Sequence, residues 1–298
     1  MGTERKTVIA LGFFDGVHLG HQALLKTAAE RAKEHDMDSA VFTFDRSPKE
    51  FVSGVPVPLI SSAEDRKEVI HRLFPIDRVI VEPFDQAMMT MDWVDFVLML
   101  AQKYRAGWLV AGHDFRFGHK NAGTPALLVK KAHQLGMGCD IIPAVTLDGV
   151  TVSSTHIRAL LQAGKMEEAG RFLGYPYTIT GKVRHGKGLG RTIGAPTLNV
   201  IPPEGQLIPA HGVYLTRVTV NGGAYAAITN VGVRPTVDEN GGVTVESHLL
   251  DLNAQLYGSD CRVEFLSMLR PEQKFSDLTA LQEQIGKDVA AAKKYFEK

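Results

Sequence analysis

Two histidines and three glycines gather in one ten-residue segment, GFFDGVHLGH, near the start of the chain. His18 and His21 are three residues apart, so both rings can face one ligand, and an imidazole can donate hydrogen bonds to a phosphoryl group. Glycine permits tight turns and close approach of the backbone to a ligand, and the three glycines are Gly12, Gly16 and Gly20. An apolar run precedes the segment and a helical pattern follows it. Free amides at that helix start, near His21, are therefore expected to favour phosphate.

Two familiar nucleotide-binding loops are absent from this segment. A Walker A loop requires Gly-Lys-Ser/Thr after its second glycine, and a dinucleotide fingerprint requires GxGxxG. P-loop kinases and dinucleotide dehydrogenases therefore lose support. The simpler alternative is a glycine-rich turn whose histidines only cap the local backbone. The preceding strand, the three glycines and Asp15 in register favour phosphate binding instead.

A second set of phosphate-binding groups lies far along the chain in the string SSTHIR, at the start of a helical pattern. Ser154 and Thr155 are natural N-cap residues, so capping alone explains their presence. Two hydroxyls, the amides of a helix start and Arg158 one turn later also make a site for a triphosphate. We therefore predict that this string and the first segment serve one reaction.

A third set of candidate residues occupies the string GKGLGRTIGAPTLN, which ends at Asn199. Gly188, Gly190 and Arg191 either form a solvated hairpin turn or a nest of amides that binds an anion. Thr197 and Asn199 alternate, so a strand would point both side chains to one face. Their oxygens suit Mg²⁺, which prefers oxygen ligands and keeps several waters.

The pattern of expected secondary structure, which must position these residues, changes part-way along the chain. Up to about Gly174, short β-rich runs alternate with helical patterns. This alternation predicts an α/β doubly wound parallel sheet whose ligands lie at the carboxyl ends of the strands. The expected strands are Thr7–Phe14, Ser39–Phe44, Arg78–Val81, Trp108–Ala111 and Cys139–Ile142. One helix, Ser154–Leu173, is expected to close this half.

Beyond Gly174–Pro176 the helical patterns stop, and glycine, proline, asparagine and aspartate separate short strand-like runs. This rhythm predicts a small antiparallel β-barrel. The expected strands are Tyr177–Val183, Gly212–Val220, Tyr225–Val231, Val243–Leu250 and Arg262–Met268, and a last amphipathic helix, Leu278–Phe296, is expected to pack against them. We therefore predict two domains, residues 1–175 and 176–298.

Bulk properties narrow the class of protein. The 298 residues include 33 basic and 33 acidic side chains with no long block of one charge, so non-specific binding to nucleic acid or a membrane surface has no electrostatic basis. Cys139 and Cys261 are far apart, which is typical of a reducing cytosol and argues against a zinc site. The first apolar run, Val8–Phe14, is too short for a leader or a membrane span. We expect a cytoplasmic protein, and weak self-association is left open.

These motifs carry a specific resemblance. The first segment resembles the HxGH signature of the nucleotidylyltransferase superfamily, which uses a doubly wound sheet, and SSTHIR resembles its SSTxIR motif. Together with the string GHDFRFG at residues 112–118, they resemble the bacterial bifunctional riboflavin kinase/FMN adenylyltransferases, or FAD synthetases, over nearly the whole chain. The resemblance implies that the first domain joins FMN to the AMP part of ATP, and that the second phosphorylates riboflavin. Substrates would be ATP, riboflavin and FMN, with Mg²⁺ as cofactor.

The resemblance also implies roles for residues of the first domain. His18 and His21 would contact the triphosphate of ATP, with the SSTHIR string on the opposite side. The nucleotide- and flavin-binding residues that it implies are Gly12, Phe13, Asp15, Gly16, Gly20, Asp114, Phe115, Ser154, Thr155 and Arg158. Phe115 and Phe117 either line a flavin pocket or belong to the core, and the sequence leaves both readings open.

One loop departs from the family's pattern. The family often has Phe-Asp-Pro-His-Pro after the second strand, where this chain has Phe-Asp-Arg-Ser-Pro at residues 44–48. That loop is expected near the nucleotide or the flavin, so its contacts differ here. His113 also replaces a residue that is commonly acidic or small.

In the second domain the glycine-rich string resembles the riboflavin kinase pattern GxxxGRxxGxPTxN, with Ala195 in place of a usual aromatic residue. The resemblance implies that Thr197 and Asn199 hold Mg-ATP. The strings NVGVRPT and VESHLLD, further along, are also similar to that family's kinase strands. They imply binding roles for Asn230 and Arg234 and make Glu246 the general base. A carboxylate fits because the ribityl hydroxyl of riboflavin is a weak nucleophile whose proton must leave. A solvated strand position is the alternative for Glu246.

Three other functions stay open from sequence. The first is a single-activity FMN adenylyltransferase whose C-terminal domain only holds flavin, and FMN formation from riboflavin separates it from the bifunctional enzyme. The second is a flavin sensor or scaffold, which would bind flavin tightly without releasing pyrophosphate. The third is a cytidylyl- or pantetheine-type transferase, which would share HxGH but lack the barrel domain.

Overall fold

The structure, a computed structural model, describes residues 5–184, 197–233, 243–250 and 256–297. Contacts between residues divide the chain into two compact units, Met1–Ser154 and Thr155–Lys298. The first unit contains a parallel sheet and the second a closed barrel, which confirms the predicted fold class. Within the described residues, no helix is long and apolar enough to cross a bilayer.

The sheet of the first unit has five parallel strands in the order β3-β2-β1-β4-β5. Their bounds are β1 Thr7–Leu11, β2 Asp38–Phe44, β3 Arg78–Glu82, β4 Ala106–Gly112 and β5 Gly138–Ile142. Every residue of β1 is buried, and after Thr7 all of them are apolar, as expected of a strand at the centre of a parallel sheet. The chain reverses its direction of travel across the sheet at β1, which pairs with both β2 and β4. Ligands of doubly wound sheets bind at such a switch point.

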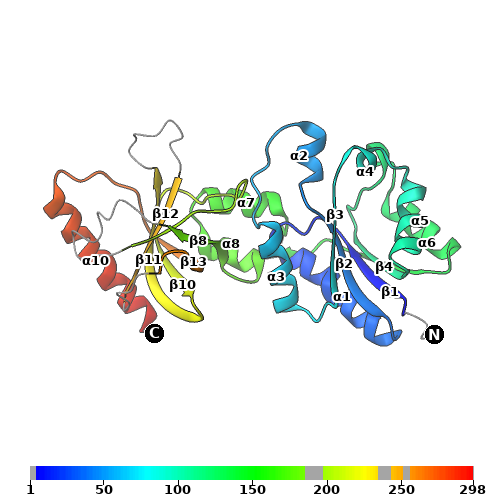
Figure 1. The fold of residues 1–298 in the computed structure, drawn as a ribbon, viewed down its shortest axis with the longest axis horizontal. Coiled ribbons are helices and arrows are strands. Elements are labelled where there is room, and N and C mark those ends of the chain that lie inside the picture. The colour runs from blue at the N-terminus through cyan, green and yellow to red at the C-terminus, as the bar shows by residue number, and fades with distance from the viewer. Residues whose placement is uncertain (1–4, 185–196, 234–242, 251–255, 298) are drawn as a thin grey trace. The chain divides into compact units, whose positions relative to one another are not determined.

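Helices cover both faces of this sheet (Figure 1). On one face α1, Leu19–Glu34, buries the predicted stripe of Leu24, Leu25, Ala28 and Ala32 against β1, β2 and β4. On the other face α5, Trp93–Lys103, and α6, Pro125–Gln134, share a core with the strands. The remaining elements of the unit are α2 Pro48–Ser53, α3 Ala63–Leu73, α4 Gln86–Thr90, a 3₁₀ turn at His119–Asn121, and the hairpin strands β6 Thr146–Leu147 and β7 Val150–Thr151.

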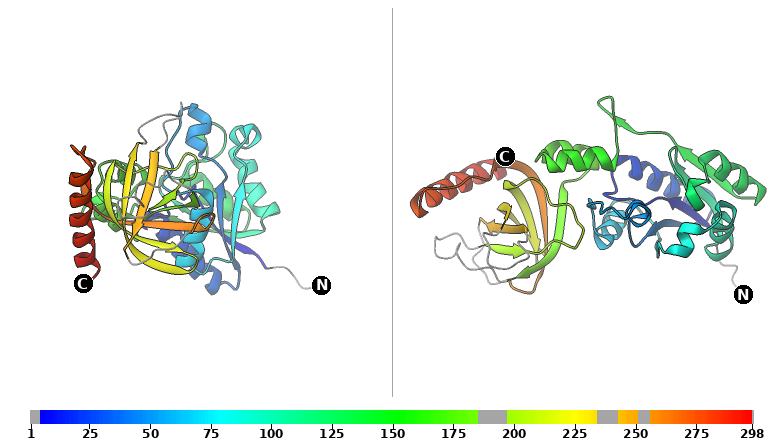
Figure 2. Two further views of the ribbon diagram at one scale, coloured as in Figure 1. Left: turned by 60° about the vertical axis from the view of Figure 1, so that its left-hand side comes forward. Right: turned by 90° about the horizontal axis from the view of Figure 1, so that it is seen from above.

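The second unit is built on a closed barrel with the strand order β10-β11-β12-β9-β8-β13. Its strands are β8 Tyr177–Arg184, β9 Leu198–Val200, β10 Gly212–Val220, β11 Gly223–Val233, β12 Val243–Leu249 and β13 Asp260–Pro271. The final helix, α10 Leu278–Phe296, lies along the outside of the barrel, as its amphipathic pattern predicted (Figure 2). Its Ala292 packs in an apolar cluster with Val213 of β10 and Ile228 of β11.

The prediction of one helix from Ser154 to Leu173 is wrong. The segment forms two helices, α7 Ser154–Gln162 and α8 Met166–Leu173. Gly164 has a left-handed φ of 74° between them, and the Lys165 amide bonds back to the Leu160 carbonyl, which ends α7. A Cβ at Gly164 would lie 2.6 Å from the Met268 sulfur, so close packing also requires glycine there. Contacts place these helices with the barrel, where α8 packs against β8 and β13.

Candidate active sites

The turn between β1 and α1 brings the two predicted histidines together. Their rings stack with centroids 3.6 Å apart and an angle of 13° between the planes. His18 is the N-cap of α1, and its Nδ1 accepts a hydrogen bond of 3.3 Å from the His21 amide. Because Nδ1 accepts this bond, the neutral His18 ring carries its proton on Nε2.

The environment of His21 keeps its ring neutral. The pKa of His21 lies well below the ordinary value, first because burial disfavours the charged ring, and then because a proton on His21 would be repelled by His18, when it is also protonated, and by the Arg66 cation. Its Nδ1 is shielded from solvent and has no hydrogen-bond partner in the described part of the chain. At this helix start the His21 amide itself is not free, since His18 caps it. The preceding helix-start amides are those of Leu19 and Gly20.

The backbone of this turn is strained. Phe14 has φ 59°, Gly16 has φ 77° and Val17 has φ 36°, and the left-handed region is unfavourable for a β-branched residue such as valine. A Cβ at Gly16 would also lie 2.8 Å from the Ile60 side chain. Two other glycines have no left-handed backbone and leave room for neighbouring rings, Gly12 for Phe14 and Gly20 for His18. Strain of this kind is held by surrounding structure and is common at binding sites.

Asp15 supplies part of that surrounding structure. Its carboxylate is 3% exposed and accepts hydrogen bonds from the amides of Ile60, at 2.9 Å, and Ser61, at 3.1 Å. The Ser61 hydroxyl in turn accepts from the Gly16 amide at 2.9 Å. Ser154 donates its hydroxyl to the Asp15 carbonyl at 3.1 Å. Asp15 therefore fastens the turn to the loop before α3, and its predicted contact with nucleotide stays a prediction.

The other predicted residues of the first reaction lie in two places. Ser154 touches the turn through Asp15, whereas Thr155 and Arg158 belong to the second compact unit. The functions of Thr155 and Arg158 therefore stay predictions. The string at 112–118 begins where β4 ends, next to the end of β1, and its Asp114 is exposed.

Phe115 and Phe117 belong to the apolar core of the first unit. Their rings lie 5.4 Å apart and nearly parallel, and Phe117 is also 5.4 Å from the ring of Phe96. Phe117 is buried, while Phe115 is partly buried at the margin of the same cluster. The core reading therefore holds for Phe117, and a flavin contact by Phe115 stays a prediction.

The atypical residues after β2 form a local turn. The Ser47 hydroxyl caps α2 by accepting from the Glu50 amide at 3.3 Å, and Pro48 is the first residue of that helix. Asp45 accepts from the Phe84 amide at 2.9 Å. Arg46 is exposed and lies 3.6 Å from the Asp45 carboxylate. Serine thus supplies a helix cap within this five-residue string.

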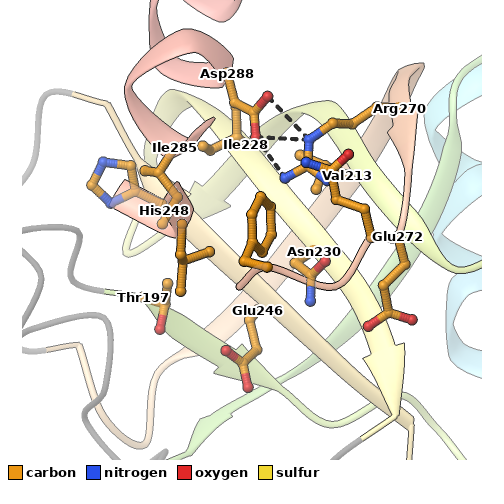
Figure 3. Close-up of a pocket in the computed structure, with 13 residues that line it drawn as sticks. Thr197, Val213, Ile228, Asn230, Glu246, His248, Arg270, Glu272, Ile285 and Asp288 are labelled. Atoms are coloured by element: carbon orange, nitrogen blue, oxygen red, sulfur yellow. Dashed lines mark hydrogen bonds and ion pairs between the residues drawn. The ribbon is translucent and has the colours of Figure 1, made fainter. Parts of the chain in front are cut away.

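A cavity of about 320 Å³ opens in the second unit, between the barrel and α10. Asn199, Glu246 and Asn230 form a row across β9, β12 and β11, since Glu246 pairs with Asn199 on one side and with Asn230 on the other. Directly paired residues of antiparallel strands share a face, so these polar side chains are neighbours. Figure 3 shows Thr197, Asn230 and Glu246 at one end of the cavity.

The rest of the cavity wall is largely apolar. It is formed by Val213, Ile228, Phe275, Leu281 and Ile285, from two barrel strands, the segment after β13 and α10. An apolar slot with a few convergent polar groups at one end is typical of a site for a flat organic ligand. His248, Glu272 and Gln273 also line the cavity.

A buried ion pair forms the other end of the cavity (Figure 3). Arg270 of β13 donates to Asp288 of α10 through Nε, at 3.1 and 3.2 Å, and through Nη2, at 2.8 Å. Gln284 donates a further bond of 2.8 Å to the same carboxylate. The Asp288 side chain is 4% exposed and that of Arg270 17%. The pair therefore fixes α10 to the barrel at the cavity.

We predict that Asp288→Ala destabilises the second unit by about 3 kcal/mol, because it leaves a largely buried guanidinium without its partner. Calorimetry of the full chain would show one thermal transition shifted downward. The double variant Arg270→Met/Asp288→Leu removes both charges and should recover part of the loss. An unchanged transition in Asp288→Ala would contradict a structural role for the pair.

Sequence reasoning did not identify the cavity's apolar wall, the Arg270–Asp288 pair or Arg66. Asp288 could have indicated the ion pair, because it is a charged residue on the apolar face of an amphipathic helix. A charged side chain at such a position is rarely buried without an oppositely charged partner. The predicted residues Gly188, Gly190, Arg191 and Arg234 lie outside the described residues. No cluster of three or more histidine, cysteine, aspartate or glutamate side chains with metal-site geometry occurs in the described part of the chain.

Comparison with known proteins assigns a family to each half of the chain. Residues 1–156 match the family model described as FAD synthetase, and residues 173–296 match the one described as riboflavin kinase. The bifunctional riboflavin kinase/FMN adenylyltransferase of Listeria monocytogenes is 35% identical, with 99% of this chain and 94% of the relative covered. Its counterpart in Pseudomonas fluorescens is 38% identical, with 97% and 93% covered. The chain belongs to the bifunctional riboflavin kinase/FMN adenylyltransferase family.

The family's architecture also occurs in a solved structure, described as a macrolide-efflux protein from Streptococcus pneumoniae. Its TM-score with this chain is 0.87 at 29% sequence identity, and the match covers 98% of this chain and 95% of that one. The likeness therefore spans both compact units. As a member of the bifunctional family, the chain carries one matched model for each of the two named activities.

Proposed function

We propose that this chain converts riboflavin to FMN and then FMN to FAD, with ATP as the donor in both steps. The observation that carries the proposal is that the chain matches the FAD synthetase and riboflavin kinase models in succession, along full-length relatives that are named for both activities. We assign adenylyl transfer to residues 1–175 and phosphorylation to residues 176–298.

In adenylyl transfer, a phosphate oxygen of FMN attacks the α-phosphorus of ATP and pyrophosphate leaves. The attacking group is already an anion, so the reaction requires alignment and charge stabilisation rather than an enzyme nucleophile. The stacked rings of His18 and His21 are proposed to contact the triphosphate of ATP, with His21 as a neutral ring. In our proposal Ser154, Thr155 and Arg158 contribute further contacts to the triphosphate.

In phosphorylation, Glu246 accepts the proton of the ribityl hydroxyl as that oxygen attacks the γ-phosphorus of ATP and ADP leaves. Support comes from the position of Glu246 at the polar end of the cavity, beside Asn230 and Asn199. The apolar wall would then hold the isoalloxazine ring, with the ribityl chain directed toward Glu246. Gly188, Gly190, Arg191 and Arg234 are proposed to contact ATP.

The residues at this end also fit Mg²⁺. Thr197 and Asn199 present oxygens, which this hard cation prefers, and the buried Oδ1 of Asn199 has no hydrogen-bond partner among the described residues. We propose that Thr197 and Asn199 hold Mg²⁺ together with ATP. When bound, the ion neutralises charge on the phosphates. The protein residues position its ligands and the attacking hydroxyl.

The test is to mix pure protein with riboflavin, ATP and Mg²⁺ and to separate the flavins by chromatography over time. FMN should appear first, followed by FAD with stoichiometric pyrophosphate, and a chelator in excess over Mg²⁺ should stop both steps. FAD from supplied FMN, without any FMN from riboflavin, would instead identify an adenylyltransferase with a non-catalytic flavin-binding barrel. Flavin binding without pyrophosphate release would overturn the proposal.

A further inference from the structure

Arg66 on α3 is the largest side chain that the structure buries completely, yet it belongs to none of the sequence motifs. It is 2% exposed. Its Nη1 donates to the carbonyl of Phe13 at 2.7 Å, and its Nη2 donates to the carbonyl of Phe44 at 3.2 Å. The guanidinium carbon also lies 4.2 Å from the centre of the Phe13 ring. A planar fork of donors is needed to reach two carbonyls in this way.

These contacts join the carboxyl ends of neighbouring strands. Phe44 ends β2, and Phe13 lies just beyond β1 in the turn that carries the histidines. The Phe13 carbonyl accepts a second bond, of 2.9 Å, from the Thr43 hydroxyl. Arg66 therefore ties the β1–α1 turn to the end of β2. Both lie at the carboxyl ends of the strands, where folds of this type bind their ligands.

The charge of Arg66 is only partly compensated. Burial lowers its pKa, while the carboxylates of Asp15, Glu64 and Asp45 act on it through space and raise it. No carboxylate in the described ranges lies within ion-pair distance of it, and its Nε has no hydrogen-bond acceptor there. Carbonyl dipoles and an aromatic face offset part of the cost of burying a cation, whereas an anion would offset more. A bound phosphate group at the adjacent turn is an anion of the required kind.

The same charge acts on His21. Burial is the main reason for the low pKa of His21, and repulsion from Arg66, and from His18 when it is protonated, lowers that pKa further. Of the strands that α1 packs against, β1 and β4 contain no titratable residue, and β2 contains only Asp38 at its opposite end. Arg66 is thus the permanent charge that acts on this ring, and His18 is the neighbouring group that can gain a charge.

We propose that Arg66 is a positioning residue for adenylyl transfer, which holds the β1–α1 turn in its binding conformation. The inference rests on the proposed function of the first domain. If Arg66 had only a structural role, its removal would not change the pH dependence of FAD formation. In the proposed role, the charge of Arg66 also affects that pH dependence through His21.

The experiment compares Arg66→Met, which removes the charge, with Arg66→Lys, which keeps it but cannot bridge both carbonyls. Arg72→Met, on the same helix but more exposed, is the matched control. FAD formation from FMN is measured from about pH 4.5 to about pH 8.5, a range that extends below the ordinary pKa of histidine because that of His21 is lowered. The ring of His21 is titrated by NMR in each protein, and FMN formation from riboflavin reports on the second unit.

Loss of the Arg66 charge should raise the pKa of His21 in Arg66→Met by about one pH unit. The pH below which FAD formation declines, its acid limb, should move upward by the same amount. In Arg66→Lys, kcat should fall at least about 10-fold with the acid limb unmoved, because charge remains but alignment is lost. FMN formation and Arg72→Met should match the wild type. Wild-type pH dependence in Arg66→Met, or a wild-type kcat in Arg66→Lys, would overturn the proposal. Absence of FAD from the wild-type enzyme would instead refute the proposed function.

Discussion

Replacement of His21 by alanine is expected to lower FAD formation from FMN by about 100- to 1000-fold, which is the usual cost of removing one well-placed group from a site that stabilises developing charge. FMN should still accumulate from riboflavin at the wild-type rate, because His21 lies in the first unit. The loss should appear in kcat more than in KM, since the ring acts on the transition state. Steady-state kinetics with each flavin as substrate measure both reactions.

A matched control keeps this result specific. His133→Ala removes an exposed histidine from the C-terminal turn of α6, in the same unit, and should leave both activities unchanged. Loss of FMN formation in a folded His21→Ala protein would show that the two reactions share this histidine. That outcome would contradict the separate assignment of the two steps.

Replacement of Glu246 by glutamine is expected to have the complementary effect. FMN formation should fall by about 100- to 10,000-fold, because the amide cannot accept the hydroxyl proton, and general-base catalysis is usually worth this much. Supplied FMN should still be adenylylated at the wild-type rate. Glutamine keeps the shape of the side chain within the row between Asn199 and Asn230, so the loss reports on chemistry rather than on packing.

Glu204→Gln, an exposed carboxylate elsewhere in the second unit, is the control for this variant. Flavin binding measured by fluorescence quenching should change little in Glu246→Gln, since the apolar wall of the cavity is untouched. A Glu246→Gln protein that phosphorylates riboflavin normally would place Glu246 on a solvated strand without a catalytic role.

The fold was predictable wherever local periodicity and burial agree. The strand β1 was located from sequence because it is a short, mostly apolar run, and α1 and α10 because each has an apolar stripe at helical spacing. The break between α7 and α8 was missed because the apolar pattern continues through Gly164, where tertiary packing against Met268 requires glycine. Barrel closure was expected, but the strand order was not, because it depends on pairing between distant segments.

Of the candidate sites, only the residues that belong to sequence motifs could be predicted. His18 and His21 are close in sequence, so their contact follows from local geometry. The role of Arg66 could not be predicted from sequence, because it bonds to the backbone carbonyls of Phe13 and Phe44. Any residue type offers such a carbonyl, so the side chains at these positions do not indicate the contact. The pair of Arg270 and Asp288 likewise depends on how α10 lies on the barrel.

The central claim, that each half of the chain carries one complete reaction, is tested most directly by mixing the two inactive variants. His21→Ala retains phosphorylation and Glu246→Gln retains adenylyl transfer, so neither alone should turn riboflavin into FAD. An equimolar mixture with ATP and Mg²⁺ should form FAD after a lag, because FMN released by one protein becomes the substrate of the other. No FAD from the mixture, with both proteins folded and supplied FMN still adenylylated by Glu246→Gln, would contradict the claim.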